Sequence, residues 1–210
     1  MIKIAIADDH QIIIDGLKLL LDDHETITVV AESCSAKGML HALKQQPADV
    51  LITDITMPEM DGIDLSLRVK IEHPDIKILA LSMNENGMII ARMMDEVKVD
   101  GYIPKSSGKN ELLKAIQTIA AGGSYFAESV LQQYKQFQQV KKQNGQFHLT
   151  LREMEIIECI IQRMSNKAIA EKLFISERTV ETHRKNIFRK TNTKGEASLV
   201  TFVKAHNLLS

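Results

Sequence analysis

Residues 2–9 read IKIAIADD, an apolar run that ends in two adjacent aspartates. A second run of this kind, VLITD at residues 50–54, ends in Asp54. A third short run, GYIPK at residues 101–105, ends in Lys105. Short apolar runs separated by helical patterns are typical of buried parallel strands. Because the carboxyl ends of parallel strands meet at one edge of a sheet, we expect the three aspartates and the lysine to converge there.

Asp8, Asp9 and Asp54 would repel one another at such an edge unless a cation held them together. Carboxylate oxygens are the ligands that Mg2+ prefers in proteins, and a neighbouring lysine suits a phosphoryl group. The pattern therefore predicts a site that binds a metal ion and carries phosphate on the protein.

Strand and helix patterns alternate from the first residue to about residue 122, which predicts an α/β doubly wound parallel five-stranded sheet. The expected strands lie near 2–8, 27–32, 49–54, 77–82 and 100–103. The expected helices lie near 11–22, 36–45, 62–72, 87–96 and 108–121.

The rest of the chain is expected to be organised differently. After an α/β domain at 1–125 we expect a Gln- and Lys-rich linker at 126–145 and a small all-α domain at 146–210. The helices of this last domain are expected to begin after the capping residues Thr150, Ser165 and Ser176, with a fourth over 195–206. Only three residues separate its second and third helices, which is a helix-turn-helix spacing.

Charge is distributed unevenly between the two domains. Residues 1–125 carry 12 basic and 19 acidic side chains, whereas residues 146–210 carry 11 basic and 7 acidic ones. An acidic first domain suits a bound cation, and a basic last domain suits a polyanion such as DNA.

The two cysteines, Cys34 and Cys159, fall in different domains, so the sequence predicts no disulfide framework and a reduced, cytoplasmic setting. The chain opens on a strand pattern without a secretory signal and has no run of 18 apolar residues, so we expect no membrane partner.

Residues 1–122 resemble the receiver domain of bacterial two-component response regulators. The resemblance rests on the paired aspartates at 8–9, on DITMPEMDG at 54–62, on Ser82 and on GYIPK at 101–105.

Residues 149–208 resemble a LuxR-type helix-turn-helix domain, through LTLREME at 149–155, SNKAIA at 165–170 and SERTVETH at 176–183. The two domains follow each other in the order of the NarL/FixJ subfamily. This resemblance implies a DNA-binding transcriptional regulator, not an enzyme, that is activated by Mg2+-dependent phosphorylation by a sensor histidine kinase.

In the receiver domain, the resemblance implies that Asp54 accepts the phosphoryl group. Mg2+ would be held by Asp9, Asp54 and the backbone carbonyl of Thr56, with Asp8 acting through a metal-bound water.

Three further residues are expected to respond to the phosphoryl group. Lys105 would pair with one of its oxygens, Ser82 would form a hydrogen bond to it, and Tyr102 would turn inward.

In the last domain, the helix over 177–190 is expected to enter the major groove. Val180 and Ile187 must face the core, which turns Glu181, Thr182, Lys185 and Arg189 outward. The expected base contacts are Glu181, Thr182 and Lys185. The other expected DNA contacts, mostly to phosphates, are Lys167, Arg178, Thr179, His183, Arg184, Arg189 and Lys190.

A phosphorylation-dependent homodimer is expected, because one helix-turn-helix unit reads few base pairs. We assign its surface to Leu199, Val200 and Val203 of the fourth helix, with Val200 projecting away from the inner apolar stripe.

Four positions depart from the subfamily pattern. Arg163 stands where many relatives carry Gly, Lys98-Val99 replace a common Gly-Ala, and Thr191 replaces a usual Leu, which is expected to loosen the end of the third helix. The departures concern local geometry and leave the phosphorylation chemistry intact.

Two alternatives remain at this point. One is a Mg2+-dependent phosphohydrolase of the haloacid dehalogenase type, although Asp8-Asp9-His10 lacks the second Asp two residues after the nucleophile. The other is an interaction protein whose basic domain binds a protein partner.

Overall fold

A computed structural model of the protein describes residues 1–83, 86–144, 147, 149–206 and 208–209. The chain forms two compact units, Met1–Tyr134 and Lys135–Ser210, and each is described by itself. Within the described part of the chain, none of the helices combines the length and apolar composition that crossing a membrane requires.

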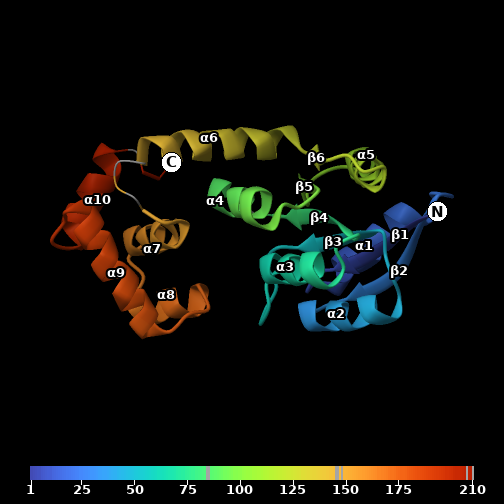
Figure 1. The fold of residues 1–210 in the computed structure, drawn as a ribbon, viewed down its shortest axis with the longest axis horizontal. Coiled ribbons are helices and arrows are strands. Elements are labelled where there is room, and N and C mark those ends of the chain that lie inside the picture. The colour runs from blue at the N-terminus through green and yellow to red at the C-terminus, as the bar shows by residue number, and fades with distance from the viewer. Residues whose placement is uncertain (84–85, 145–146, 148, 207, 210) are drawn as a thin grey trace. The chain divides into compact units, whose positions relative to one another are not determined.

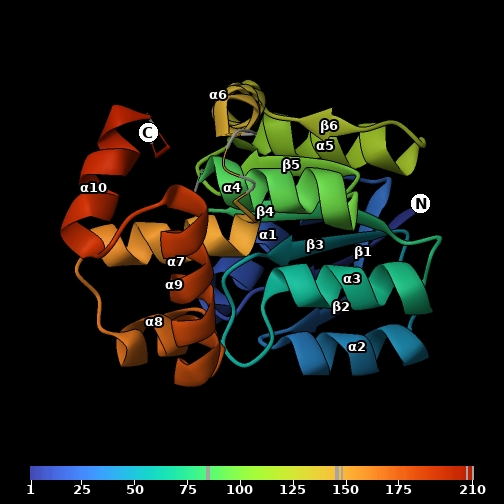
Figure 2. The ribbon, with the colours of Figure 1, turned by 60° about the vertical axis from the view of Figure 1, so that its left-hand side comes forward.

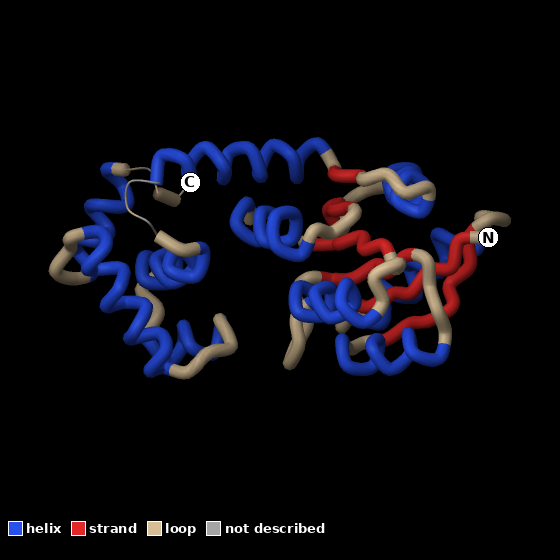
Figure 3. The backbone as a smooth tube through the Cα atoms, in the orientation of Figure 1, coloured by secondary structure: helices blue, strands red, loops and turns tan. Residues whose placement is uncertain are grey.

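The first unit is built on one parallel sheet with strand order β2-β1-β3-β4-β5-β6. Its strands run through the core and are shown in red in Figure 3. They are β1 (Ile2–Ala7), β2 (Ile27–Ser33), β3 (Val50–Asp54), β4 (Lys77–Ser82), β5 (Gly101–Pro104) and β6 (Tyr125–Phe126).

The sixth strand corrects the expectation of a five-stranded sheet. After the turn at Gly122, whose φ is 88°, the chain returns alongside β5, and Tyr125 pairs with Gly101. A two-residue strand is too short to give a periodic signal, so the sequence pattern did not reveal it.

Helices cover both faces of this sheet. Figure 2 shows α2 (Ala36–Gln45), α3 (Gly62–Glu72) and α4 (Gly87–Ala91) on one face. The other face carries α1 (Gln11–Asp22) and α5 (Lys109–Ala120), where Lys109 pairs with Asp23 at 3.1 Å. The expected helix near 87–96 is α4 followed by a π-helical segment, η1 (Arg92–Val97).

Most of the segment expected as a linker is helical. Helix α6 (Glu128–Asn144) starts in the first unit and crosses the boundary between the units (Figure 1). Val130 is fully buried in the first core, and the Tyr134 hydroxyl donates to Asp95 at 2.7 Å. Gly145, the last residue of the expected linker, lies outside the described residues.

The second unit is helical, as expected. It contains α7 (Leu151–Ile161), α8 (Asn166–Lys172), α9 (Glu177–Thr191) and α10 (Glu196–Ala205). The predicted N-caps are confirmed, since the side chains of Thr150, Ser165 and Ser176 each accept a backbone N–H three residues later. Glu153 completes a capping box with Thr150.

The unusual residues Lys98 and Arg163 have the left-handed backbone that glycine adopts most easily, with φ of 57° and 58°. This geometry explains why Gly would suit both positions. Thr191, expected to loosen the end of the third helix, is the last residue of α9, and its buried hydroxyl donates to the Ile187 carbonyl at 2.8 Å.

Candidate functional site: an acidic pocket and a recognition helix

The sheet register brings the predicted acidic site together. Asp8 follows Ala7, which pairs with Thr53 immediately before Asp54. Lys105 follows Pro104, which pairs with Ser82. These side chains therefore leave neighbouring strands at one edge, as the order of apolar runs predicts.

Lys105 lies between two carboxylates. Its Nζ is 2.6 Å from Asp8 Oδ2 and 3.0 Å from Asp54 Oδ2. The other oxygen of Asp54 accepts the backbone N–H of Ile55 at 2.8 Å. All three ionic side chains are at most 9% exposed, so their attraction acts with little solvent screening. Lys105 thus balances acidic charge directly, a contact that sequence reasoning did not anticipate.

Burial and ion pairing shift the pKa values of Asp54 and Lys105. Burial raises the pKa of Asp54 above its usual value, although hydrogen bonding and attraction by Lys105 act in the opposite direction. Burial opposes the charge of Lys105, but its hydrogen bonds to Asp8 and Asp54 raise the pKa of this ammonium above its usual value. The lysine therefore stays charged at neutral pH.

Asp8, Asp9 and His10 form a cluster that has the spacing to hold a metal ion. His10 Nδ1 is 2.8 Å from Asp9 Oδ1, but the imidazole is 65% exposed and lies at the rim. The remaining donors are carboxylate oxygens, which suit a hard divalent cation. Thr56, whose carbonyl was expected to join them, lies in the exposed part of the loop after β3.

The expected switch residues Ser82 and Tyr102 lie on the neighbouring strands β4 and β5. Ser82 is 1% exposed at the end of β4, and its carbonyl accepts the Lys105 backbone N–H at 2.9 Å. Tyr102 on β5 is completely buried, so its ring is already inward in this structure.

Gly62 shapes the wall of the pocket. Its N–H donates to the Ile55 carbonyl at 2.9 Å, which folds the loop back onto β3. A Cβ at this position would lie 1.9 Å from the Asp54 carbonyl oxygen. Only glycine fits this approach of the two backbones.

On the second unit, α9 presents the expected polar face. Val180 and Ile187 are fully buried, which fixes the rotation of the helix. The exposed expected contacts are Arg178, Glu181, Thr182, Lys185 and Arg189. The expected contacts that are only partly exposed are Thr179, His183, Arg184 and Lys190.

Two cations of α9 are paired with acids from flanking helices. Lys190 Nζ is 2.6 Å from Oε2 of Glu153 on α7. Arg184 forms an ion pair with Glu196 in the first turn of α10. Neither pairing has a sequence signal, because each joins residues of different helices.

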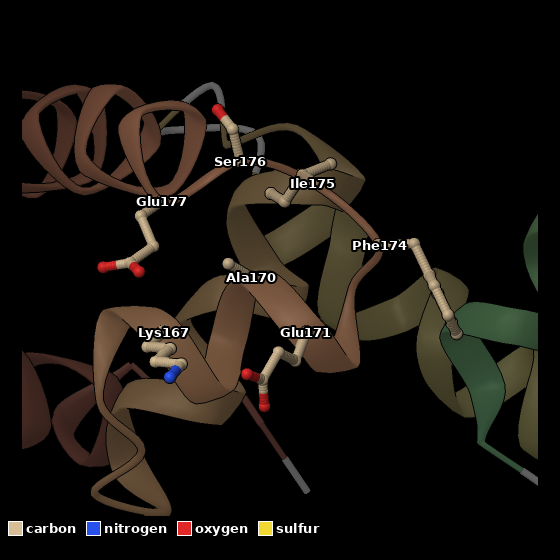
Figure 4. Close-up of a pocket in the computed structure, with 7 residues that line it drawn as sticks. All are labelled: Lys167, Ala170, Glu171, Phe174, Ile175, Ser176 and Glu177. Carbon is tan, nitrogen blue, oxygen red and sulfur yellow. The ribbon is translucent and has the colours of Figure 1, made fainter.

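Lys167, the expected contact on α8, lines a pocket at the turn between α8 and α9 (Figure 4). Glu171 and Glu177 contribute opposite charge to the same pocket. Phe174 at the turn is 71% exposed and extends away from α8 in the close-up. Lys167 therefore has acidic neighbours on α8 and at the start of α9.

The expected dimer residues on α10 differ in accessibility. Leu199 and Val203 are 0% and 3% exposed in the core of the unit, so their side chains are not available to a partner. Val200 is partly exposed. Of the three residues, Val200 alone can contribute to a surface.

The chain thus joins a doubly wound domain, which carries an aspartate–lysine cluster at one sheet edge, to a helix-turn-helix unit. Residues 4–117 match the family of response regulator receiver domains, and residues 148–203 match the bacterial regulatory proteins of the luxR family. The chain therefore belongs to the response regulators, with the domain order of the NarL/FixJ type.

Two regulatory proteins are similar in sequence to this chain along almost its whole length. The transcriptional regulatory protein MctR of Rhizobium johnstonii is 32% identical over 209 residues, which cover 100% of this chain and 96% of MctR. The oxygen regulatory protein NreC of Staphylococcus epidermidis is 32% identical over 216 residues, with 99% of both chains covered.

A solved structure shows the same architecture. RcsB from Salmonella enterica serovar Typhimurium, bound to promoter rprA with the phosphomimetic BeF3−, is 26% identical and superposes with a TM-score of 0.66. The match covers 97% of this chain and 98% of RcsB. Together these similarities identify a transcriptional response regulator and set aside the phosphohydrolase alternative.

Proposed function

We propose that this protein converts phosphorylation of Asp54 into promoter binding by α9. The observation that carries the proposal is the placement of Lys105 between Asp8 and Asp54 at distances of 2.6 and 3.0 Å. A fixed ammonium beside a carboxylate nucleophile is positioned to meet the charge of an incoming phosphoryl group.

In the transfer step, an oxygen of Asp54 attacks the phosphorus of a phosphohistidine on a sensor kinase or of a small acyl phosphate. The bond to the donor atom breaks as the acyl phosphate bond forms on Asp54. Lys105 exchanges its contact with Asp54 for one with a phosphoryl oxygen, and Ser82 at the neighbouring strand end donates its hydroxyl to another.

Mg2+ is the cofactor that this donor set suits, because the available ligands are oxygen atoms beside a phosphoryl site. The residues that would hold it are Asp8, Asp9, Asp54 and the Thr56 carbonyl. When bound, the ion neutralises charge on the transferring group. The Oδ1 atom of Asp9 is buried and lies 2.8 Å from the imidazole of His10. This oxygen is suited to bind the ion.

For DNA binding, we propose that α9 enters the major groove. Its exposed residues Glu181, Thr182 and Lys185 would contact base edges. Arg178 and Arg189 on the exposed face would contact phosphates, which position the helix without reading sequence. A phosphorylated homodimer would read two half-sites, as expected of a promoter-binding regulator in the cytoplasm.

The direct test is labelling with acetyl phosphate in the presence of Mg2+, followed by intact mass analysis. Asp54→Asn should remove the labelled species, because an amide is not a competent nucleophile. Asp64→Asn, which neutralises an exposed acid in the first turn of α3, should label normally. Labelling of Asp54→Asn at the wild-type rate would reassign the phosphorylation site.

A further inference from the structure

The cations of α9 differ in how their charge is used within the domain. Arg178, Lys185 and Arg189 are exposed on the outer face. Arg184 is only 16% exposed, and its guanidinium is paired with the carboxylate of Glu196. The positive charge of Arg184 is therefore already engaged in the absence of DNA.

Three features hold this pair in place. Glu196 lies in the first turn of α10, where the helix dipole favours a negative charge. The Arg184 guanidinium also lies over the Phe188 ring, 5.8 Å from its centre. The arginine side chain is mostly shielded from solvent, whereas Glu196 is 56% exposed, so solvent screens the pair from the carboxylate side only.

Arg184 nevertheless borders the proposed DNA-contacting face. It follows Glu181 by three positions on α9, a spacing that places two side chains side by side on a helix. It also directly precedes Lys185. Released from Glu196, a side chain as long as arginine would be close to any phosphate lying along this face.

We propose that Glu196 is a specificity-determining residue that holds Arg184 away from DNA phosphates. This inference rests on the proposed role of α9 in DNA binding. Phosphate contacts strengthen binding to every sequence alike, whereas base contacts discriminate. By engaging one cation beside the reading face, Glu196 limits binding to random DNA and leaves discrimination to Glu181, Thr182 and Lys185.

The test measures the salt dependence of binding to a random duplex by the full chain. Glu196→Gln should steepen the slope of log affinity against log salt by about 0.9, the value for one additional phosphate contact. The factor by which affinity falls between about 50 and 200 mM salt should then be roughly 3.5 times larger for Glu196→Gln than for the wild type. Discrimination between a selected site and the random duplex should fall.

Two further variants separate this role from a general change in charge. Glu158→Gln removes an equal charge from a partly exposed position on α7, a helix that carries none of the expected DNA contacts, and should leave the slope unchanged. In the double variant Arg184→Gln/Glu196→Gln, the added slope should disappear. Circular dichroism melting of each variant checks that the helical unit remains folded.

The outcomes are distinct. A Glu196→Gln slope equal to that of the wild type, or an equal increase in Glu158→Gln, overturns the role of Glu196 while DNA binding itself stands. A wild-type chain that binds no duplex at either salt concentration overturns the proposed function of α9, and this inference with it.

Discussion

The acidic pocket around Asp8, Asp54 and Lys105 uses charge in the opposite way to helix α9. In the pocket, Asp8, Asp54 and Lys105 lie at the ends of three strands and are almost fully buried, and Lys105 contacts both carboxylates within 3.0 Å. The charged side chains of α9 all lie on a single helix, and most of them project into solvent. A buried cluster positions one reaction, whereas an exposed row can adapt to a long polyanion. This contrast predicts that a backbone change at the pocket lowers stability and phosphorylation strongly. Removal of one charge from α9 should lower DNA affinity only in part.

The largest effect is expected for Gly62→Ala. The new Cβ would lie 1.9 Å from the Asp54 carbonyl oxygen, so the loop or β3 must shift. We expect a loss of roughly 1–3 kcal/mol of stability and acetyl phosphate labelling close to background, measured by chemical denaturation and mass analysis.

Gly16→Ala on α1 is the matched control. A Cβ there meets no atom within 4 Å, so the change should stabilise the protein by about 0.5–1 kcal/mol. Normal labelling of Gly62→Ala would show that the pocket tolerates backbone movement, and the contrast with α9 would then fail.

Lys185→Ala should lower the affinity for a selected site more than that for random duplex. The difference should be about 1–3 kcal/mol, the usual value of a good base contact. Lys172→Ala, at the end of α8, serves as a control for charge loss in the same unit. If Lys185→Ala weakens both duplexes equally, this lysine contacts phosphate and the reading face lies elsewhere on α9.

A smaller effect on stability is expected when Glu153, a buried carboxylate of the second unit, loses its charge. Burial alone would raise the pKa of this carboxyl, but Lys190 and Thr150 together lower it below the usual value. Its contribution to stability is therefore complete above the ordinary glutamate pKa of about 4.3 and is lost as the pH falls through the lowered folded value.

Melting curves of wild type and Glu153→Gln across this pH range check the assignment. The wild-type transition of the helical unit should fall towards that of the variant as the pH decreases. A constant difference at all pH values would show that the carboxylate charge is unimportant.

The smallest effect is expected at the left-handed residue Arg163. Glycine relieves the backbone cost of about 1–2 kcal/mol but loses more entropy on folding, by roughly 0.5–1 kcal/mol. Arg163→Gly should therefore stabilise the second unit by up to about 1.5 kcal/mol, measured by thermal melting. Arg163→Ala, which keeps the strain, should show no such gain.

Much of this architecture follows from sequence, for identifiable physical reasons. Parallel strands have their carboxyl ends at one edge, so apolar runs ending in Asp8, Asp54 and Lys105 were enough to predict that these residues converge. Capping side chains such as Thr150 were predicted because their hydrogen bonds are local in sequence.

Other features depend on contacts that no local pattern encodes. Arg184 and Glu196 are separated by 12 positions and meet because α9 and α10 pack together. The sequence therefore predicts a phosphate contact for Arg184 but gives no sign of its ion pair with Glu196. The two-residue strand β6 likewise depends on a turn at Gly122 and not on a periodic run.

The central claim is that a group added at Asp54 controls DNA binding by α9. It is tested most directly by titrating duplex DNA into the full chain with and without beryllofluoride and Mg2+, with sedimentation in parallel. The account predicts that beryllofluoride raises both DNA affinity and the dimer fraction of the wild type, and changes neither in Asp54→Asn. Equal DNA affinity of the wild type with and without beryllofluoride would contradict it.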